Sequence, residues 1–413
     1  MSQTTPSAPG ALGHIKVLDL SRVLAGPWAA QVLGDLGAEV LKVEAPGQGD
    51  DTRTWGPPFL TQADGSAGDA AYFSACNRNK RSVTIDFAKP DGAALVRRLA
   101  AEADVVVENF KTGGLAKYGL DYASLKAVNP RLVYCSVTGF GQTGPYAHRA
   151  GYDFLIQGMG GLMSITGHPD GAEGGGPMKV GVAVCDLFTG MYAAVAILAA
   201  LAHRDRTGEG QHIDCALFDS QVAMLANQSA NWLAGGMVPG RLGNNHPNVV
   251  PYRVYPTADG HVIVACGNDN QFQRLCAALG RPELAEDERF RANAGRIRNR
   301  EAIDALLTDL LSAHTRGDVV TLLEKAGVPC GPINTVPDVF ADPHARARGV
   351  EVEMARDDGT RIPVVAFPAR LGGTPATYRL APPRLGQDTD AALQDWLGLD
   401  TAGVAKLRRA GIL

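Results

Sequence analysis

One carboxylate stands at the start of an apolar segment and could act as a covalent nucleophile. Asp186 lies in Gly181-Val-Ala-Val-Cys-Asp-Leu-Phe-Thr-Gly190, where it begins an apolar helix directly after a glycine-rich loop. Burying an unpaired carboxylate costs several kcal/mol, so such a residue is typical of a chemical role. A helix-capping carboxylate is the structural alternative, and the residues alone leave both interpretations open.

A second acidic residue and the glycine-rich loop accompany this carboxylate. Asp153 opens another apolar stretch, Gly151-Tyr-Asp-Phe-Leu-Ile-Gln157, where a plain N-cap is again the structural alternative. The loop over residues 158–181 contains no GxGxxG or GxxxxGK[ST] pattern, which argues against a nucleotide-phosphate site of those kinds. A loop of this length is either a flexible surface segment or a lid over a reacting centre, and the sequence favours neither.

Basic residues, histidines and cysteines give weaker signals. The cluster Asn77-Arg-Asn-Lys-Arg81 precedes a strand and could bind phosphates or form a solvated loop. None of the nine histidines stands in an HxxxH, HExxH or GxSxG context, so zincin and serine-hydrolase chemistry have no foothold. The seven cysteines are scattered and form no CxxC pair, which predicts reduced thiols, no metal site and a cytoplasmic location.

Alternating strands and helices must position these candidates. Apolar runs predict strands at 15–20, 39–44, 82–87, 104–108 and 131–137, with helices at 27–36 and 90–103. The alternation predicts an α/β fold built on a large doubly wound, Rossmann-like parallel sheet. Ligands lie beyond the carboxyl ends of such strands, so the turns at Leu24–Pro27, Asn109–Phe110 and Thr138–Gly141 should line a cleft.

The alternation continues through a helix from Asp186 to His203, a strand at 212–216 and a helix through Trp232, and then stops. A polar loop at 241–248, a hairpin-like pair over 254–265 and charged helices predict a smaller α+β domain. We therefore expect a flexible leader over 1–13, a large domain over 14–225 and 336–413, and a small domain over 226–335. The irregular tail from Pro337, with strands at 349–355 and 360–365, should pack over another surface.

Composition excludes several classes of partner. The chain has 413 residues, of which 45% are hydrophobic and 20% charged, enough for one large or two modest cores. A net charge of −4 argues against nucleic acid and anionic membranes, which both require concentrated positive charge. Residues 1–13 lack the pattern of a signal peptide, and the apolar segment 187–202 is shorter than the roughly 20 residues of a bilayer span. It predicts a buried core helix.

Several ordered motifs resemble those of the family III CoA-transferases, over nearly the whole chain. They are Val17-Leu-Asp-Leu-Ser-Arg-Val-Leu-Ala-Gly-Pro27, Leu36-Gly-Ala-Glu-Val-Leu-Lys-Val-Glu44, Asn79-Lys-Arg-Ser82, Val107-Glu-Asn-Phe110, Thr138-Gly-Phe-Gly-Gln-Thr-Gly-Pro145, Gly151-Tyr-Asp153, Asp186 with Thr189-Gly190, and Val328-Pro-Cys-Gly-Pro-Ile333. So many motifs in order are far more specific than one short pattern.

The resemblance implies roles for particular residues. Asp186 falls on the catalytic aspartate of the family, which would attack an acyl-CoA thioester and pass through anhydride and aspartyl-CoA intermediates. CoA and acyl-CoA are then substrates, and no permanently bound cofactor or metal is expected. The positions implied in CoA binding are Leu24, Ala25, Ala45, Ile85, Asp86, Phe87, Ala88, Asn109, Phe110, Lys111, Lys117, Ala150, Gly151, Tyr152 and Asp153.

The chain departs from formyl-CoA transferase at some of these positions. Leu24, Ala45 and Ala88 stand where that enzyme has a glutamine, an arginine and a lysine, which argues against oxalate or formyl specificity. Lys42, Lys89 and Arg81 are the candidates to supply the missing charge toward the phosphates. The loop at 243–248 resembles that of the glutarate-type branch, so dicarboxylates such as succinate or glutarate are the expected acyl groups.

Two other functions compete with this interpretation. An α-methylacyl-CoA racemase shares the fold but has a histidine where this chain has Tyr152, and a tyrosine with a reference pKa of about 10 is a poor base near neutral pH. A non-enzymatic CoA-binding or assembly protein would retain its behaviour after Asp186→Ala. The resemblance also implies an interlocked, ring-like homodimer, which composition and periodicity do not establish.

Overall fold

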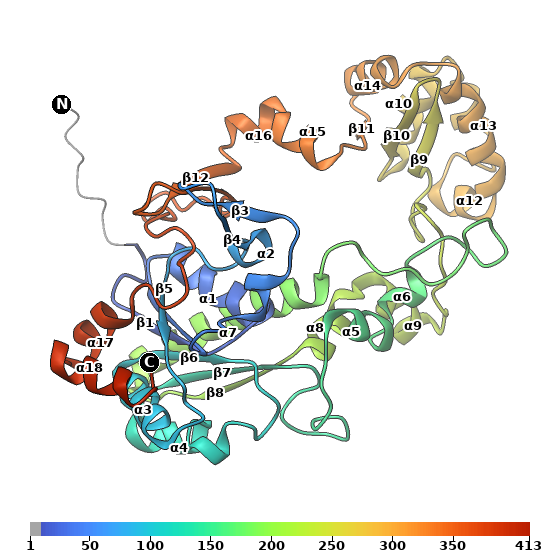
Figure 1. Cartoon of the computed structure of the whole chain (residues 1–413). Coiled ribbons are helices and arrows are strands. Elements are labelled where there is room, and N and C mark those ends of the chain that lie inside the picture. The colour runs from blue at the N-terminus through green and yellow to red at the C-terminus, as the bar shows by residue number, and fades with distance from the viewer. Residues whose placement is uncertain (1–9) are drawn as a thin grey trace. The chain divides into compact units, whose positions relative to one another are not determined.

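The computed structural model describes residues 10–413, which divide into two compact units (Figure 1). The first unit comprises residues 10–162, 180–235 and 344–413. The second comprises residues 163–179 and 236–343.

A six-stranded parallel sheet forms the centre of the first unit, in the order β5-β2-β1-β6-β7-β8. Its strands are β1 (Lys16–Asp19), β2 (Glu39–Glu44), β5 (Lys80–Thr84), β6 (Val105–Glu108), β7 (Val133–Thr138) and β8 (His212–Ala216). Leu18 of β1 lies opposite Leu41 of β2 and Val106 of β6. Buried apolar runs of this kind are typical of parallel sheets covered on both faces. The predicted parallel α/β sheet is confirmed.

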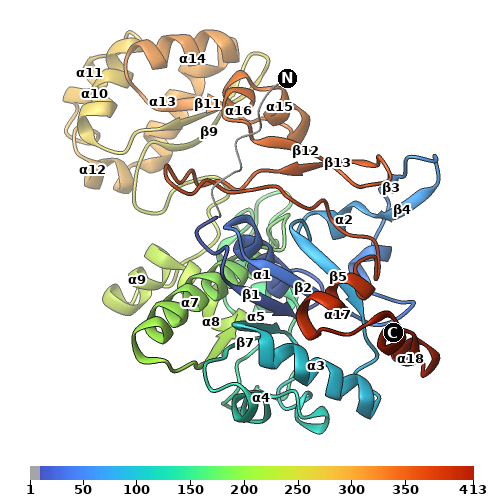
Figure 2. The same ribbon diagram turned by 90° about the vertical axis from the view of Figure 1, so that its left-hand side faces the viewer.

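Helices cover both faces of this sheet. The core on one face includes α1 (Ala25–Asp35) and α7 (Val184–Thr207). The core on the other includes α3 (Pro90–Glu102), α4 (Tyr122–Val128) and two C-terminal helices, α17 (Thr389–Leu397) and α18 (Thr401–Arg409). Figure 2 shows α17 beside α3, to which it packs. The tail therefore packs on another surface, as predicted.

The strand order reverses between β1 and β6. The chain proceeds outward from β1 through β2 to β5, returns to β6 on the other side of β1, and continues to β7 and β8. The turns that follow β1 and β6 therefore diverge at the carboxyl edge of the sheet. Such a switch point leaves a crevice in which open α/β sheets bind their ligands.

The strand predicted at 82–87 is shifted in the structure. β5 begins at Lys80 and ends at Thr84, and residues 85–89 connect it to α3. The Lys80 ammonium donates to Asp19 Oδ2 at 2.8 Å, and both side chains are fully buried. A lysine inside the sheet interrupts the apolar pattern, so sequence reasoning missed the start of the strand.

The predicted roles of the basic cluster over residues 77–81 are wrong. Arg78 donates from Nε to Asp35 Oδ1 at 2.9 Å, inside the protein. Asn79, at a φ of 59°, accepts from the backbone N–H of Arg379 and holds the C-terminal tail against α1. The cluster is neither a solvated loop nor a phosphate site, because Asn77, Arg78, Asn79 and Lys80 are buried and paired, and the partly exposed Arg81 pairs with Glu39 and Asp395.

Helix α7 is longer and more exposed than the predicted buried core helix. Its 24 residues are long and apolar enough to cross a membrane, a property that core helices of globular domains share. Ala193, Ile197 and Leu201 belong to the buried core. The other face carries Phe188, Met191, Tyr192 and Val195, all at least 41% exposed. We call these four residues the α7 stripe.

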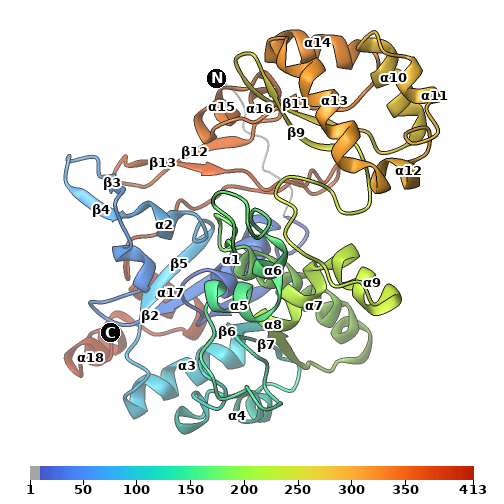
Figure 3. The ribbon, with the colours of Figure 1, turned by 90° about the vertical axis from the view of Figure 1, so that its right-hand side faces the viewer.

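The second unit has its own sheet and core (Figure 3). Its strands β9 (Tyr252–Thr257), β10 (Gly260–Ala265) and β11 (Cys330–Pro332) are antiparallel, in the order β11-β10-β9. Its helices are α10 (Asp269–Ala278), α11 (Glu283–Glu286), α12 (Asn293–Arg298), α13 (Arg300–Ser312), α14 (Arg316–Lys325) and α15 (Val336–Ala341).

The bounds of this unit differ from the predicted small domain over 226–335. Residues 163–179, predicted to belong to the large domain, join it, and the Gly243 N–H donates to Gly167 O at 3.0 Å. The predicted loop over 158–181 is therefore divided between the units, and it contains the short helix α6 (Leu162–Ile165). Such pairing between distant glycines leaves no periodic signal in the sequence.

The remaining elements complete the first unit. They are η1 (Asp51–Thr54), β3 (Phe59–Thr61), β4 (Ala67–Ala70), α2 (Ala71–Ser74), η2 (Ala116–Tyr118), α5 (Asp153–Met159), α8 (Leu217–Met224), α9 (Ala226–Gly235), β12 (Glu351–Ala355) and β13 (Arg361–Val365), with α16 (Pro343–Ala347) at its boundary. Of the predicted leader, residues 1–9 lie outside the described residues. Leu12 donates its N–H to Leu36 O at 2.9 Å and packs on the core, so residues 10–13 are not a free leader.

Candidate active site

A cavity of about 460 Å³ opens at the carboxyl edge of the parallel sheet. Its walls are the turns that follow β1, β6 and β7, together with the segment 149–152 and Asp186. Leu24, Asn109 and Thr138 come from the three turns that the sequence placed at a cleft, and that prediction is confirmed. The cavity occupies the crevice expected at the switch point between β1 and β6.

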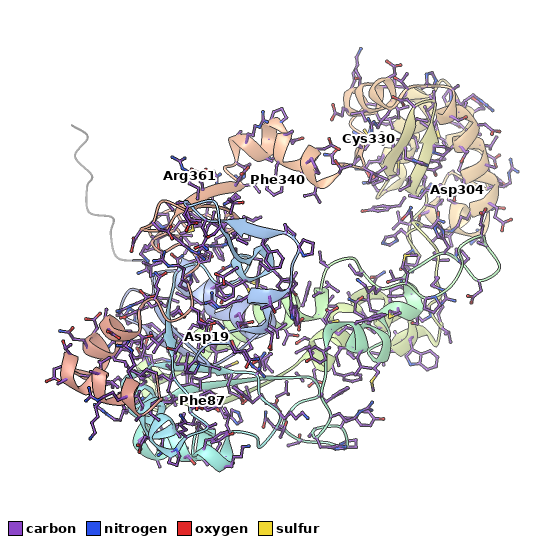
Figure 4. All side chains as sticks on the ribbon, in the orientation of Figure 1. Asp19, Phe87, Asp304, Cys330, Phe340 and Arg361 are labelled. Atoms are coloured by element: carbon purple, nitrogen blue, oxygen red, sulfur yellow. The ribbon has the colours of Figure 1, made fainter. Side chains whose placement is uncertain are left out.

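Most of the residues implied in CoA binding meet at this cavity. Phe87, labelled in Figure 4, packs edge to face with Phe110 and Tyr118, with ring centroids 5.7 and 5.6 Å apart. The aromatic cluster gives the cavity an apolar wall. The predicted site residues that line it are Leu24, Ala25, Phe87, Asn109, Phe110, Lys111, Lys117, Ala150, Gly151, Tyr152 and Asp186.

Five predicted residues do not line the cavity. Ala45 lines a neighbouring hollow with Phe87 and Phe110, and Ala88 lines another with Lys117 and Tyr118. Ile85 is fully buried in the core, and Asp86 donates its backbone N–H to Ile412 O. Asp153 lies behind the wall, where it contacts the start of α7.

Asp186 occupies the first turn of α7, half-buried at the cavity wall. Burial, and then the nearby charge of Asp153, raise the pKa of its carboxyl from 3.8 to about 7. The N–H groups at a helix N-terminus favour the charged form and oppose this rise. Among the described residues none donates a hydrogen bond to the Asp186 carboxylate, so its lone pairs are open to a substrate.

The sequence left a helix-capping role open for both Asp153 and Asp186. In the structure Asp153 caps a helix, and that helix is α7. Asp153 is the first residue of α5, yet its Oδ1 accepts from the Cys185 N–H of α7 at 2.7 Å. Its Oδ2 accepts from Gln157 Nε2 at 2.7 Å. The N-cap of α7 itself, Ala183, makes no side-chain cap bond. Asp153 therefore caps α7 from another element, and Asp186 does not cap it.

Two motif glycines bring these elements together. A Cβ added to Gly139, which follows β7, would lie 2.6 Å from the Cα of Gly151. A Cβ on Gly190 of α7 would lie 2.6 Å from the Ala25 carbonyl oxygen of α1. Both contacts are far below a van der Waals distance to backbone, so a side chain would push the elements apart. The glycines thus set how closely the segment 150–153 and α1 approach Asp186.

The turn after β1 has a strained residue in the cavity wall. Val23 has a φ of 71°, in the left-handed region that a β-branched residue rarely adopts. Such strain costs about 1–3 kcal/mol and persists only when the surroundings enforce it. The Asp50 carboxylate accepts from the Val23 N–H, with both oxygens 3.3 Å away. Asn109 holds the preceding residue, Arg22, through its backbone N–H and carbonyl.

Sequence reasoning missed several cavity residues. Arg22 and Arg149 add two cations to the predicted Lys111 and Lys117. Arg22 lies two residues before the predicted Leu24 and Arg149 lies directly before the predicted Ala150, so proximity in the sequence was an available signal. Tyr72 of α2 does not line the cavity, although burial and then the charge of Asp186 raise the pKa of its hydroxyl to about 12.

Lys42, Lys89 and Arg81 were predicted to supply positive charge toward the phosphates of CoA. Two of them are already paired with carboxylates of the protein. The Lys42 ammonium is fully buried and donates to Asp50 Oδ2 at 2.9 Å. Arg81 pairs with Glu39 and Asp395. Lys89 is half-exposed and lines the hollow beside Lys117, although it also donates to the Gly411 carbonyl at 2.6 Å and forms a partly exposed ion pair with Asp86 at 3.6 Å. The prediction is wrong for Lys42 and Arg81, because carboxylates already neutralise them.

Metal ligands and disulfides do not organise the site. Across residues 10–413 no group of three or more His, Cys, Asp or Glu side chains could hold a metal ion. All seven cysteines are free thiols.

Comparison with known proteins gives a consistent result. A model of CoA-transferase family III matches residues 12–389. A succinate–glutarate CoA-transferase of Agrobacterium fabrum is 54% identical over 92% of this chain and 94% of its own. A human succinyl-CoA:glutarate CoA-transferase is 41% identical over 97% and 90%. The crystal structure of a CAIB/BAIF family protein from Brucella suis, 54% identical, superposes with a TM-score of 0.83 over 94% of this chain and 100% of that one.

Proposed function

The chain belongs to CoA-transferase family III, and we propose that it transfers CoA from an acyl-CoA donor, such as succinyl-CoA, to a dicarboxylic acid, with Asp186 as nucleophile. The observation that carries the proposal is the Asp186 carboxylate itself. It faces the cavity without a donor among the described residues, and its pKa is raised to about 7. A carboxylate of raised pKa is more basic than a free aspartate, and more nucleophilic once ionised.

The proposed reaction conserves the thioester energy through four acyl transfers. Asp186 attacks the thioester carbonyl of the donor, the C–S bond breaks, and a mixed anhydride and CoA thiolate form. The thiolate then attacks the aspartyl carbonyl, which releases the donor acid and leaves an aspartyl-CoA thioester. The acceptor carboxylate attacks that thioester to form a second anhydride and free the thiolate. Attack on the acceptor carbonyl gives the new acyl-CoA and restores Asp186.

Backbone donors at the start of α1 suit the oxyanions of these steps, because Ala25 lines the same cavity as Asp186. Ala25 and Gly26, the first residues of α1, have N–H groups with no acceptor among the described residues. Leu24, the N-cap, makes no side-chain cap bond that would occupy them. Donors fixed in a partly closed site stabilise developing negative charge without reorganisation. We propose that α1 presents these two groups to the reacting carbonyl.

Basic and aromatic side chains around the cavity suit the rest of the substrate. CoA carries phosphates and an adenine ring, which favour cations and aromatic faces. Arg22, Lys111, Lys117 and Arg149 line the cavity, next to the cluster of Phe87, Phe110 and Tyr118. We propose that CoA binds along this wall. The predicted positions Ala45, Ile85, Asp86, Ala88 and Asp153 would act from the neighbouring hollows or through the elements they support.

The names of the relatives support a dicarboxylate as the acceptor acid. Both relatives above are named for glutarate together with succinate or succinyl-CoA. Their names are those of CoA-transferases, which does not favour the racemase alternative, and Tyr152 remains a poor base for that chemistry. The free thiols support a reducing, cytoplasmic location for the enzyme.

A trapped intermediate tests the proposed mechanism. Incubation with succinyl-CoA without an acceptor should leave an adduct on Asp186, detected by mass spectrometry after hydroxylamine or borohydride treatment. Asp186→Asn keeps the shape of the side chain but should lose at least about 10⁴-fold in kcat, since the nucleophile is gone. An adduct on another residue, or a fully active Asp186→Asn enzyme, would contradict the mechanism.

A panel of acids tests the substrate class. Succinyl-CoA is supplied with C2 to C6 mono- and dicarboxylates, and new CoA esters are followed by chromatography. Dicarboxylates should exceed monocarboxylates of equal length in kcat/KM. Deuterium exchange at the α-carbon of a branched acyl-CoA, in the absence of an acceptor acid, would indicate a racemase instead.

A further inference from the structure

We propose that the buried Lys42–Asp50 pair is a positioning device, which holds Val23 in its left-handed conformation and thereby aims the start of α1 at Asp186. The inference rests on the proposed function, because its consequence is the alignment of backbone donors with the carbonyl that Asp186 attacks. Neither Lys42 nor Asp50 lines the cavity of Asp186, and Asp50 reaches only the neighbouring hollow that contains Ala45, so we infer that the pair acts on Asp186 through the turn that follows β1.

The turn cannot keep its conformation unaided. Val23 is one of only three non-glycine residues with a positive φ among residues 10–413, and the only β-branched one. A valine released from its contacts would relax toward the extended region, because its branched side chain clashes in the left-handed one. The turn therefore needs an acceptor that fixes the Val23 N–H in its observed direction.

Asp50 supplies that acceptor. Its two oxygens lie 3.3 Å from the Val23 nitrogen, and its Oδ1 also accepts from the N–H and hydroxyl of Thr52, at 3.0 and 2.7 Å. Although burial alone would raise it, the Lys42 ammonium lowers the pKa of Asp50 to about 2. The carboxylate is therefore charged at any working pH, and a charged acceptor holds an N–H more strongly than a neutral one.

Lys42 also binds the backbone on the other side of the turn. Its Nζ donates to Asp50 Oδ2 at 2.9 Å and to the Ser21 carbonyl at 2.8 Å. Ser21 in turn donates its N–H to Asp19, which is labelled at the centre of the sheet in Figure 4. The ammonium thus ties the last residue before the turn to the carboxylate that holds Val23.

The position of α1 follows from this turn. Leu24, the N-cap, comes directly after Val23, and the open N–H groups of Ala25 and Gly26 follow it. The Ala25 carbonyl packs against Gly190 of α7, one turn beyond Asp186. A rotation at Val23 would swing these donors relative to Asp186 while both helices remain intact. A loss of alignment of this kind lowers kcat more than it weakens substrate binding.

Asp50→Asn tests the Lys42–Asp50 pair, which we call the clamp. The substitution keeps the shape of the side chain and removes its negative charge. We expect kcat to fall by about tenfold or more, with KM changed less than about threefold. The second substitution, Val23→Gly, removes the need for the clamp, since glycine adopts this φ without strain. The double variant Val23→Gly/Asp50→Asn should therefore recover kcat to within about threefold of Val23→Gly alone. Its melting temperature should stay low, because Lys42 remains buried without its partner.

Asp35→Asn is the matched control. It also removes one carboxylate from a buried pair, that with Arg78, at the opposite end of α1 from the cavity. It should lower the melting temperature, leave the kcat of the folded enzyme unchanged and show no rescue by Val23→Gly. Equal loss of kcat in both asparagine variants, or no rescue of Asp50→Asn, would overturn the proposal.

If neither the single variant Asp50→Asn nor the double variant with Val23→Gly folds, a milder substitution still tests the proposal. Thr52→Val preserves both charges and removes only the hydroxyl that orients Asp50. It should lower kcat by about threefold, and Val23→Gly should reverse that loss; an unchanged kcat would overturn the proposal. The Asp186 adduct is measured in every variant. If only the clamp has failed, the adduct on Asp186 should still form, although slowly. If the proposed function is wrong, no adduct should form on Asp186 in any variant.

Discussion

Two neighbouring acidic side chains, Asp153 of α5 and Asp186 of α7, have opposite environments. Asp153 accepts hydrogen bonds from Cys185 and Gln157, which satisfy its charge, whereas Asp186 faces the cavity without a donor from the described residues. A carboxylate in such a position ionises less readily, and its neighbour adds repulsion. The pair thus separates into a hydrogen-bonded carboxylate and one whose oxygens are open to the cavity. This division is what the proposed nucleophile requires.

The pH dependence of the reaction should report this environment. Because only the ionised carboxylate attacks, kcat/KM should fall tenfold per unit as the pH drops below about 7, the raised pKa of Asp186, and stay level above it. Asp153→Asn removes one of the two causes, so the inflection should move to lower pH. It should remain above 3.8, because burial persists.

Asp304→Asn is the control for this shift, since Asp304 bonds to Tyr255 and Arg253 in the second unit. Initial rates across pH 4.5–9 measure both profiles. An inflection that is identical in Asp153→Asn and the unmodified enzyme would contradict the electrostatic argument.

Close backbone contacts determine how the elements around the site approach each other. β7 and the segment leading to α5 meet at Gly139 and Gly151, and α1 meets α7 at Gly190. Each contact joins two motifs that are distant in sequence. The glycines are therefore needed for proximity, since no side chain fits between the two backbones.

Gly139→Ala tests this role at the level of an element. The new Cβ would lie 2.6 Å from the Gly151 Cα, and backbone cannot rotate away as a side chain can. The segment 150–153 should shift and weaken the cap on α7, with a loss of about 1–3 kcal/mol in stability and at least about tenfold in kcat/KM. Thermal melts and steady-state kinetics measure both.

Gly317→Ala in α14 is the matched change, because nothing lies within 4 Å of its added Cβ. It should leave activity unchanged and stability equal or higher, since alanine favours a helix. Unchanged kinetics in Gly139→Ala would show that the contact does not position the site.

At the scale of the whole molecule, the α7 stripe is the feature that a single chain does not explain. Phe188, Met191, Tyr192 and Val195 recur at helical spacing and stay exposed, and the proposed nucleophile lies at the start of the same helix. Contiguous apolar surface of this kind marks an interaction site. We propose that a second copy of the chain covers it, in the homodimer that the family resemblance implies.

Sedimentation tests the dimer. The enzyme should sediment at twice the 43.4 kDa of one chain, and dilution should give unfolding rather than a folded monomer. Met191→Asp, in the stripe, should reduce the dimer. Val128→Asp, on α4 at 53% exposure, should not, because it adds the same charge outside the stripe. A folded, active monomer of the unmodified chain would contradict the proposal.

The sequence by itself determined the alternating elements, the parallel sheet, the cleft turns and the candidate nucleophile, because apolar periodicity and motif residues are local properties. Only the tertiary structure decided which polar side chains form ion pairs or hydrogen bonds inside the protein and which remain open to a substrate. It buried Lys42 and Lys80 against carboxylates, turned Asp153 from a cap of its own helix into a cap of α7, and strained Val23 at the cavity wall. Such pairings join residues far apart in the chain, and their energy depends on burial, which no local pattern records.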